Sequence, residues 1–327
     1  MSATEAPPER TEFDRDVVIV GGGPAGCSTG VFTARYGLDT VVFDRGRSSI
    51  QRCAFLENYL GFPAGIDVET LYDLMHDHAE KAGCEVVVDL VESVEPLDAG
   101  IGDEADEAEI GGEAGGDHRG FVVETQEGRT VTARRVVAAT RYDGEYMRGL
   151  DDEDAMFETH EHDGEVREHF DKTYADEDGT TPVGGLYVAT PYETGYQASM
   201  AAGRGARVGI TVVEDARRER GVPEALADHY DWMRRERDLT EEWADRDRWR
   251  EYIHDRLPDD HGLDEERLVE MREREIDRRF ETYLTDDEVG QRTRRGHKRL
   301  LEHVDDDAIL AAARRIENER SASEASD

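Results

Sequence analysis

The sequence predicts an α/β domain with a central parallel sheet, followed by a charged helical extension. Three observations lead to this prediction. The stretch Asp16-Val-Val-Ile-Val-Gly-Gly-Gly-Pro-Ala-Gly26 is an apolar strand that runs into a glycine turn and then a helix. A second apolar strand, Thr40-Val-Val-Phe-Asp44, follows at the distance typical of a β-α-β unit. After Glu214 the residues are almost all charged and helix-forming.

The glycine turn has the spacing Gly21-x-Gly23-x-x-Gly26, which is typical of loops that bind the diphosphate of a dinucleotide. One glycine permits the tight turn, the next lets the backbone approach the diphosphate, and the third lets helix pack on strand. The helix N-terminus adds free N–H groups and a positive dipole end. We therefore assign cofactor binding to Gly21, Gly22, Gly23, Pro24, Ala25, Gly26, Asp44 and Arg45. Asp44 is expected to bind a ribose hydroxyl.

The charge of the chain excludes some classes of partner. The sequence has 78 acidic and 40 basic residues and a formal net charge of −38. Such a field repels nucleic acid and anionic membranes, so we expect neither as a partner. It also destabilises a compact state unless salt screens it. The composition resembles that of halophilic, cytosolic proteins from salt-loving archaea.

Cysteine usage and hydropathy indicate a cytoplasmic, reducing location. The three cysteines, Cys27, Cys53 and Cys84, form no CxxC and no metal-ligand spacing. No run of about 18 apolar residues is present, so no membrane span is expected. The pair His160-x-His162 could bind a metal, but a solvated loop is the preferred interpretation, and we predict no metal site.

The rest of the first 214 residues continues the α/β pattern. We expect a helix over 67–82, a strand over 85–91, a hairpin over 121–125 and 130–132, a strand over 135–140, a strand over 185–189 and a glycine-rich helix over 195–213. Residues 1–13 are predicted to be a disordered lead-in and 97–120 an acidic, glycine-rich insert. The segment 141–184 is predicted to be a charged linker.

Two further segments have more than one interpretation. The loop Phe55–Pro63 carries aromatic side chains, and it either lines a flat aromatic ligand or covers part of the core. Residues 215–327 form an acidic, helical extension with intermittent apolar anchors, for which an interaction or lid role is the preferred interpretation.

The order of these pieces resembles the FAD-binding domain of thioredoxin reductase-like flavoproteins. The resemblance covers about residues 14–212, within a domain placed at 14–214, and Glu57-Asn-Tyr-Leu-Gly-Phe-Pro63 is its most specific part. It implies an FAD-type three-layer Rossmann (ββα) domain with a β-meander. It also implies FAD, with its diphosphate over Gly21–Gly26 and its isoalloxazine ring near Asn58 and Gln197, and it suggests a homodimer.

The sequence departs from that family pattern at several points. The family inserts an NADPH domain with a CxxC, whereas the 44 residues of 141–184 are too short for a nucleotide domain of about 100 residues. Arg141 replaces the glycine of Ala-Thr-Gly, and Thr190-Pro191 replaces the Gly-Asp that normally holds the ribityl chain. Asp44 stands where the family usually has Glu.

These observations favour a flavin-dependent oxidoreductase whose electrons come from an external donor, substrate or partner that the sequence does not identify. No catalytic residue is identified. Cys53 is a weak candidate because its loop should approach the ring, although a lone cysteine is more often a packing residue. Two alternatives stay open: a non-catalytic nucleotide-binding protein that uses the helical extension to bind a partner, and an NAD(P)-dependent dehydrogenase.

Overall fold

The computed structural model describes residues 13–98, 118–141, 143–162, 165–190, 197–258 and 261–324. The predicted lead-in up to residue 12 and the predicted insert over 99–117 lie outside these residues. The chain divides into two compact units, Met1–Ala216 and Arg217–Asp327. The sequence prediction placed this boundary between residues 214 and 215.

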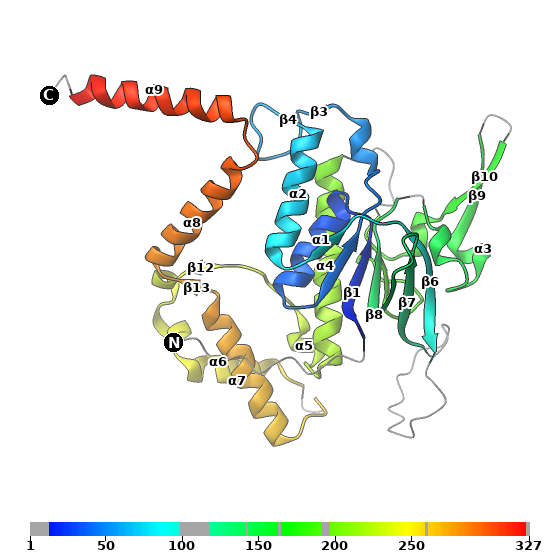
Figure 1. Cartoon of the computed structure of the whole chain (residues 1–327). Coiled ribbons are helices and arrows are strands. Elements are labelled where there is room, and N and C mark those ends of the chain that lie inside the picture. The colour runs from blue at the N-terminus through cyan, green and yellow to red at the C-terminus, as the bar shows by residue number, and fades with distance from the viewer. Residues whose placement is uncertain are drawn as a thin grey trace. The chain divides into compact units, whose positions relative to one another are not determined.

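The first unit is built on a seven-stranded sheet (Figure 1). Its strands run in the order β5-β2-β1-β8-β7-β6, and β11 also pairs with β8. The β5, β2, β1, β8 and β11 pairings are parallel, whereas β6, β7 and β8 form an antiparallel meander. The strands are β1 Arg15–Val20, β2 Thr40–Phe43, β5 Glu85–Val87, β6 Val91–Asp98, β7 His118–Thr125, β8 Thr130–Ala138 and β11 Leu186–Val188.

Strand β8 corrects one prediction. The sequence analysis divided this region into the second strand of a hairpin and a separate buried strand, but both are halves of a single strand. The first half pairs with β7, from Thr130 to Ala133, and the second half pairs with β11, from Val136 to Ala138. No glycine or proline interrupts this stretch, so the strand continues from the meander into the parallel sheet.

The two faces of the sheet bury alternate residues of the same strands, as expected for period-two side-chain alternation. Val17, Ile19 and Val137 belong to a core cluster shared with the helices. Their neighbours Val18, Val20 and Val136 face a second cluster. The result is three layers, with helices on one face and the meander and the segment after β8 on the other.

The helical layer consists of α1 Pro24–Arg35, α2 Val68–Ala82 and α4 Ala198–Glu219, which lie on one side of the sheet in Figure 1. Close contact between α1 and α4 depends on glycine. A Cβ at Gly205 would lie 2.0 Å from the carbonyl oxygen of Ala25, and one at Gly209 would lie 2.9 Å from Cβ of Phe32. The helix predicted over 195–213 would begin with residues 195 and 196, which lie outside the described residues.

The segment 141–184 is folded, which corrects its prediction as a charged linker. It contains the short helix α3 Glu153–Met156 and the antiparallel hairpin of β9 Phe157–His162 and β10 Glu165–Phe170. Its few apolar side chains enter the core on the second face of the sheet: Tyr146, Met147, Met156, Phe157 and Phe170. These residues occur as two adjacent pairs and one single residue among charges, so no periodic pattern indicated their burial.

A small cluster lies beneath the loop after β2. The hairpin of β3 Phe55–Leu56 and β4 Ile66–Asp67 contributes Leu56 and Ile66, and α2 contributes Leu71 and Tyr72. Tyr59 and Phe62 of the aromatic loop pack against this cluster. Two of the loop's rings therefore cover core, as one of the two interpretations of the loop expected.

The second unit is mainly helical. Its elements are α5 Glu224–Ala227, β12 Arg234–Arg235, α6 Arg246–Arg256, α7 Glu265–Glu281, β13 Tyr283–Leu284, α8 Asp286–Leu301 and α9 Asp306–Glu324. Its core includes Trp249 and Ile253 of α6 and Met271 and Ile276 of α7. Its arginines and acids supply much of the remaining cohesion.

A buried ion pair lies in this unit. Arg217 donates from Nη2 to Oε2 of Glu275 over 2.9 Å, and from Nε to the carbonyl oxygen of Ala227 over 2.8 Å. Both side chains are almost fully buried. Burial raises the pKa of Glu275, but the hydrogen bond from Arg217 and the charges of Arg278 and Arg217 outweigh it and hold the pKa below its usual range.

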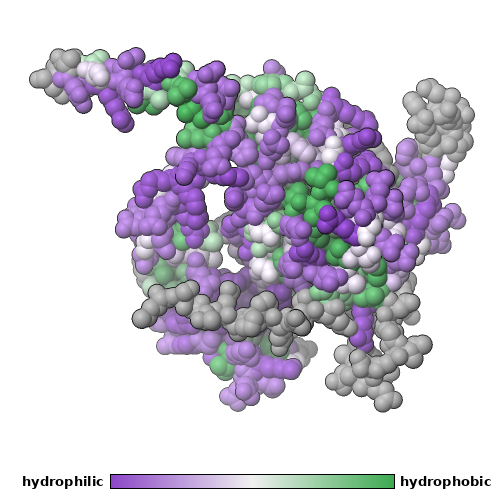
Figure 2. Space-filling model, viewed as in Figure 1, coloured by the Kyte–Doolittle hydropathy of each residue, from purple (hydrophilic) through white to green (hydrophobic). Residues whose placement is uncertain are grey.

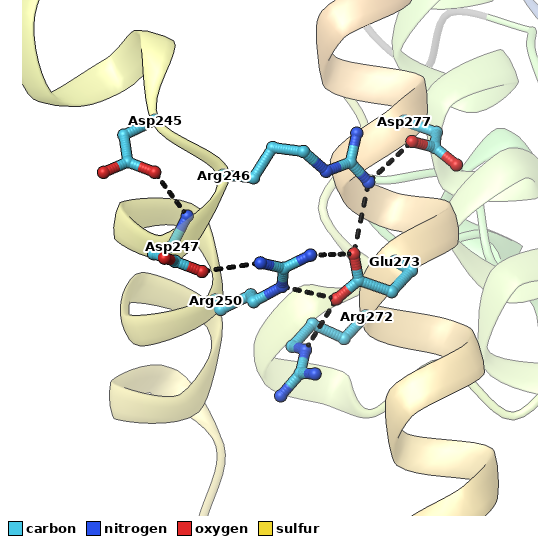
Figure 3. A network of polar contacts seen from close by, with 7 residues as sticks. All are labelled: Asp245, Arg246, Asp247, Arg250, Arg272, Glu273 and Asp277. Carbon is cyan, nitrogen blue, oxygen red and sulfur yellow. Dashed lines mark hydrogen bonds and ion pairs between the residues drawn. The ribbon is translucent and has the colours of Figure 1, made fainter.

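A second network joins α6 to α7 at a more exposed position (Figure 3). The carboxylate of Glu273 accepts from Nε and Nη2 of Arg250, both over 2.8 Å. It also accepts from Arg246 and Arg272 over 3.2 Å. The hydrogen bonds from Arg250, followed by those from Arg246 and Arg272, outweigh burial and lower the pKa of Glu273 to about 2.

Candidate functional site

The glycine loop between β1 and α1 has the geometry of a binding loop. Gly21 has φ 112°, a conformation that favours glycine, and a Cβ there would lie 2.7 Å from the carbonyl oxygen of Ala139. A Cβ at Gly26 would lie 1.8 Å from the carbonyl oxygen of Gly21. Gly23 is the N-cap of α1 and makes no side-chain capping bond, and Pro24 begins the helix. The turn therefore presents the helix N-terminus with no side chain over it.

A pocket of about 690 Å³ opens beside this loop. This volume lies within the range of about 300 to 1,000 Å³ that is usual for small-molecule sites. The pocket is lined by Gly21, Gly22, Gly23, Asp44 and Arg45, among the predicted residues. The carboxyl ends of β1, β2 and β8 meet here, which is where parallel α/β sheets bind their ligands.

Four arginines line this pocket although the chain as a whole is strongly acidic: Arg45, Arg47, Arg52 and Arg141. Arg45 is paired with Asp143, whose Oδ2 lies 2.7 Å from its Nη1. Ser48 lies against the loop, because a Cβ at Gly23 would meet its Oγ at 2.6 Å. The lining also holds five acids, Asp44, Asp89, Glu92, Asp143 and Glu145, so it is mixed in charge. The arginines, the hydroxyl and the exposed backbone are the groups in it that suit a phosphate-bearing ligand.

Asp44 is held at the edge of the pocket by neighbouring groups. Its Oδ2 accepts from the hydroxyl of Tyr72, and its Oδ1 accepts from the N–H of Gly46 over 3.1 Å. His76 lies 3.4 Å from the same Oδ2 and 3.0 Å from the carbonyl oxygen of Gly22. Burial, followed by the hydrogen bond with Asp44, raises the pKa of Tyr72. Since each carboxylate oxygen has two lone pairs, Asp44 can still accept a ribose hydroxyl.

Arg141 occupies the position where the related pattern has glycine, and its backbone keeps the conformation that glycine favours. Its φ is 67°, and it is the one non-glycine residue with positive φ within the described ranges. Its N–H donates to Oγ1 of Thr190 over 2.9 Å. A non-glycine residue in this strained region at a pocket wall is typical of functional sites.

The predicted residues Asn58 and Gln197 are brought together, although 139 positions separate them in the chain. Nδ2 of Asn58 donates to Oε1 of Gln197 over 2.8 Å. They line a different hollow, of about 500 Å³, together with Phe55, Leu56 and Glu57. The structure therefore places these two amides side by side, but outside the pocket of Gly21 and Asp44.

The cysteines do not meet at the candidate site. Cys53 is exposed and lines a third hollow with Asp67 and Tyr72, and it is not among the residues that line the hollow of Asn58. Cys27 is buried, and its thiol donates to the carbonyl oxygen of Gly22 over 3.2 Å. Burial, followed by the charge of Asp44, raises the pKa of Cys27 to about 12, so this thiol is a packing group.

Several pocket residues escaped the sequence analysis. Arg47, Ser48 and Arg52 follow Asp44 directly, and the concentration of arginine here in an acidic chain was an available signal. Tyr72 and His76 stand four positions apart on one face of α2, but nothing in the sequence connects that face with Asp44.

Within the described residues, no group of three or more His, Cys, Asp or Glu side chains could hold a metal ion. None of the described helices combines the length and apolar character needed to cross a membrane.

Comparison with curated proteins finds short matches to thioredoxin reductases. The chain is 37% identical over 84 residues to thioredoxin reductase of Streptomyces clavuligerus, covering 25% of this chain and 26% of that protein. It is 39% identical over 72 residues to thioredoxin reductase of Bacillus subtilis, covering 21% and 22%. The aligned segments thus span about a quarter of the length of these relatives.

Solved structures with a related fold include thioredoxin reductases. The one from Gloeobacter violaceus has a TM-score of 0.46 and 19% identity, covering 68% of this chain and 98% of that one. The thioredoxin reductase of T. acidophilum has a TM-score of 0.42 and 17% identity, covering 62% of this chain and 98% of that one.

The family assignment rests on a longer match than these. Residues 15–240 match the family described as pyridine nucleotide-disulphide oxidoreductase. This range includes the sheet, the glycine loop, Asp44 and every residue of the pocket. The chain therefore belongs to the pyridine nucleotide-disulphide oxidoreductase family.

Proposed function

We propose that this chain binds FAD and acts as an oxidoreductase that receives electrons from an external donor. One observation carries the proposal: the glycine loop and the N-terminus of α1 open onto a pocket whose lining of mixed charge includes four arginines, with Asp44 at its edge. This is the arrangement that an adenosine diphosphate group needs, since it offers N–H groups and cations to the diphosphate and a carboxylate to the ribose.

The residues present fit the adenosine diphosphate half of FAD. Gly22 and Gly23 let the loop backbone lie close to two polar side chains, since a Cβ would meet Cβ of Asp44 at 2.5 Å or Oγ of Ser48 at 2.6 Å. The loop backbone, Asp44 and Ser48 therefore lie close together at the wall of the pocket. Arg47 and Arg52 would supply charge to the diphosphate, and the Asp44 carboxylate is already oriented by Tyr72 and Gly46.

The flavin end of the site is supported less fully. Asn58 and Gln197 would contact the ring, as the family resemblance implies. Thr190 stands in place of the glycine before the family's ribityl-binding acid and is engaged with the N–H of Arg141. Pro191, in place of that acid, lies outside the described residues. Losing a charged hydrogen bond there weakens binding by about 1.5 to 3 kcal/mol unless another group replaces it.

A bound flavin would supply the electron or hydride transfer chemistry, and the protein would position and tune it. In this proposal the chain's own residues bind and orient the cofactor. The cysteines at positions 27, 53 and 84 form no CxxC, so we do not propose thioredoxin reduction. The electron donor would be a separate reductase, a substrate or NAD(P)H that docks without a dedicated domain.

A non-catalytic nucleotide-binding role is the second candidate. The departures from the family's Ala-Thr-Gly and Ala-Gly-Asp patterns, at Arg141 and at Thr190-Pro191, favour it. We also infer a cytoplasmic, salt-rich working environment. The net charge of −38 and the three free cysteines, Cys27, Cys53 and Cys84, support that inference.

The test is flavin binding by protein purified in molar salt. We expect a yellow protein that releases FAD on denaturation, or an apoprotein that takes up added FAD with micromolar affinity or better. The double variant Arg47→Ala/Arg52→Ala should bind FAD at least about tenfold more weakly, because charged hydrogen bonds contribute about 1.5 to 3 kcal/mol each. Gly23→Leu should abolish retention, since its side chain would enter the pocket.

Matched controls separate binding from folding. Arg237→Ala removes an exposed arginine of the second unit, and Gly203→Ala fills open space on α4, so both should retain FAD. Circular dichroism checks that every variant is folded. A colourless protein that takes up no FAD at any salt concentration contradicts the proposal. Bound flavin that NADH, NADPH and chemical donors of physiological potential all fail to reduce supports the non-catalytic role.

A further inference from the structure

The segment formed by α8 and α9 carries two adjacent stretches of opposite charge. Residues 289–301, the basic stretch, contain five arginine or lysine side chains and one histidine but no acid. Residues 302–307, the acidic stretch, contain four acids and no arginine or lysine. In a chain with 78 acids and 40 basic residues, a run of 13 residues without an acid is a clear departure from the composition.

The basic stretch brings like charges close together on α8. Arg294 and Lys298, like Arg295 and Arg299, stand four positions apart on α8, where like charges repel across one turn. Arg299 is paired with Glu302, but within the described residues no ion pair involves Arg294, Arg295 or Lys298. The acids of the first turn and the cations of the last turn match the helix dipole, so the repulsion is confined to these neighbouring pairs. The cations without an ion pair are nevertheless available to an acidic partner.

Apolar side chains accompany these charges. Neither α8, with 16 residues, nor α9, with 19, buries a single side chain. Large apolar residues are instead about half exposed along both helices: Leu300 54%, Leu301 50%, Val304 45%, Leu310 50% and Ile316 44%. In Figure 2 hydrophobic colouring is seen on the part of α9 nearest α8. Because helices in proteins draw most of their stability from packing an apolar face, this segment lacks the cover that it needs.

We propose that α8 and α9 form a self-association surface for a second copy of this chain. In a two-fold arrangement the basic stretch of one copy lies along the acidic stretch of the other, and the same contact occurs twice. Leu300, Leu301 and Val304 stand where the two stretches meet, so this pairing buries them at its centre. The like-charge repulsion within α8 is then offset by the partner's carboxylates.

The charge pattern favours a second copy over other occupants. Nucleic acid and anionic membranes would be attracted by the basic stretch, but they would be repelled by the four acids that follow it directly and by the net charge of −38. Nucleic-acid interfaces are also more polar than a surface with five half-exposed aliphatic side chains. A second copy offers both charges and the apolar side chains in one segment.

The experiment measures oligomeric state by analytical ultracentrifugation of the full chain at moderate and at molar salt. We expect the wild-type chain to be dimeric. The basic-reversed variant Arg294→Glu/Arg295→Glu/Lys298→Glu should be monomeric, with a dimer dissociation constant raised at least tenfold. The acid-reversed variant Asp306→Lys/Asp307→Lys should also be monomeric. Asp305 is left unchanged because its Oδ1 accepts from the N–H of Ala308, at the start of α9, over 3.0 Å.

Mixing the two reversed variants provides the decisive test. Equal amounts of the two reversed variants should form a heterodimer, since each then presents the charge that the other lacks. Leu300→Ser/Val304→Ser, which leaves all charges in place, should also weaken the dimer and serves if a reversed variant fails to fold. Flavin content measured on the same samples should not change, so this proposal and the cofactor proposal can fail separately.

Several outcomes overturn the proposal. The proposal is wrong if the wild-type chain stays monomeric at high micromolar concentration. It is also wrong if the reversed variants remain dimeric, because the interface would then lie elsewhere. Failure of the mixture to associate removes the charge-pairing arrangement. Binding of the wild-type chain to duplex DNA or anionic vesicles, lost in the basic-reversed variant, would identify a different occupant.

Discussion

At the residue scale, Arg141 combines two opposing effects in one position. Its backbone has φ 67°, a region that disfavours residues with a Cβ by about 1 to 2 kcal/mol. Its side chain lines the candidate cofactor pocket. A glycine would relieve the backbone, so we infer that the arginine contributes its charge to the pocket.

This explanation makes a prediction about Arg141→Gly. We expect its unfolding free energy to stay equal or rise by up to about 1 kcal/mol, because strain relief exceeds the added entropy of the unfolded chain. Its affinity for FAD should fall about tenfold with the loss of a cation. Denaturant unfolding and flavin titration measure the two effects. Arg141→Ala is the control, because it removes the charge but keeps the strain and should lose affinity without gaining stability. Unchanged affinity in both variants would show that this side chain does not contact the ligand.

Asp44 shows how a residue can be identified from sequence while its surroundings cannot. Its place at the end of the second strand indicated a role at the ribose end of the pocket. Its contacts with Tyr72 and His76 come from α2, which the structure brings against β2. That relation joins residues about 30 positions apart through packing, and no short-range pattern reports it.

At the element scale, helices α6 and α7 are joined by the carboxylate of Glu273, which accepts from three arginines (Figure 3). The pKa of this carboxyl group is lowered from 4.5 to about 2 in the folded chain. Its stabilising contribution is therefore complete above about pH 4.5 and is lost as the pH falls from there through about 2.

We therefore expect Glu273→Gln to melt at a lower temperature than wild type at pH 7. The difference should shrink as the pH is lowered from 5 toward 2, when the wild-type carboxylate becomes protonated as well, and also in molar salt. Thermal melts at a series of pH values test this. Glu270→Gln, an exposed acid on the same helix, is the matched control and should change little. A Glu273→Gln deficit that does not depend on pH would assign the effect to packing.

At the scale of the whole molecule, the net charge opposes the compact state. The chain carries 40 basic and 78 acidic residues, and 40 − 78 gives −38. The surface in Figure 2 is accordingly mostly hydrophilic in colour. Self-repulsion of this size opposes the compact state, and added salt screens it with a Debye length of about 3 Å at 1 M.

This predicts that the melting temperature rises steeply with KCl up to about 1 M and more slowly beyond, as screening saturates. Sucrose at matched osmolality is the control for general stabilisation, and it should produce a smaller rise in the low-concentration range. Scanning calorimetry or dye-based melts provide the measurement. A melting temperature that is insensitive to salt would mean that the surface charges are already neutralised by local pairing.

Local sequence patterns predict much of the secondary structure of the first unit. The first β-α-β unit, which consists of β1, the glycine turn, α1 and β2, depends on contacts within about 30 residues. Hydrophobic runs and glycine spacing were therefore sufficient to identify it. The same patterns misjudged β8 and the segment 141–184. Strand β8 is one strand that pairs in two ways, and the segment 141–184 buries isolated apolar pairs and single residues that show no period.

The sequence by itself determined the α/β class, the glycine loop, the acid at position 44 and the change to a charged helical region near residue 214. Each of these features depends on residues that are close together in the sequence. Only the tertiary structure decided that Tyr72 and His76 surround Asp44, that Asn58 contacts Gln197, that Arg141 is strained at the pocket wall and that Cys53 lies elsewhere. The physical reason is that these relations join distant parts of the chain, and the packing of helices on a sheet sets them.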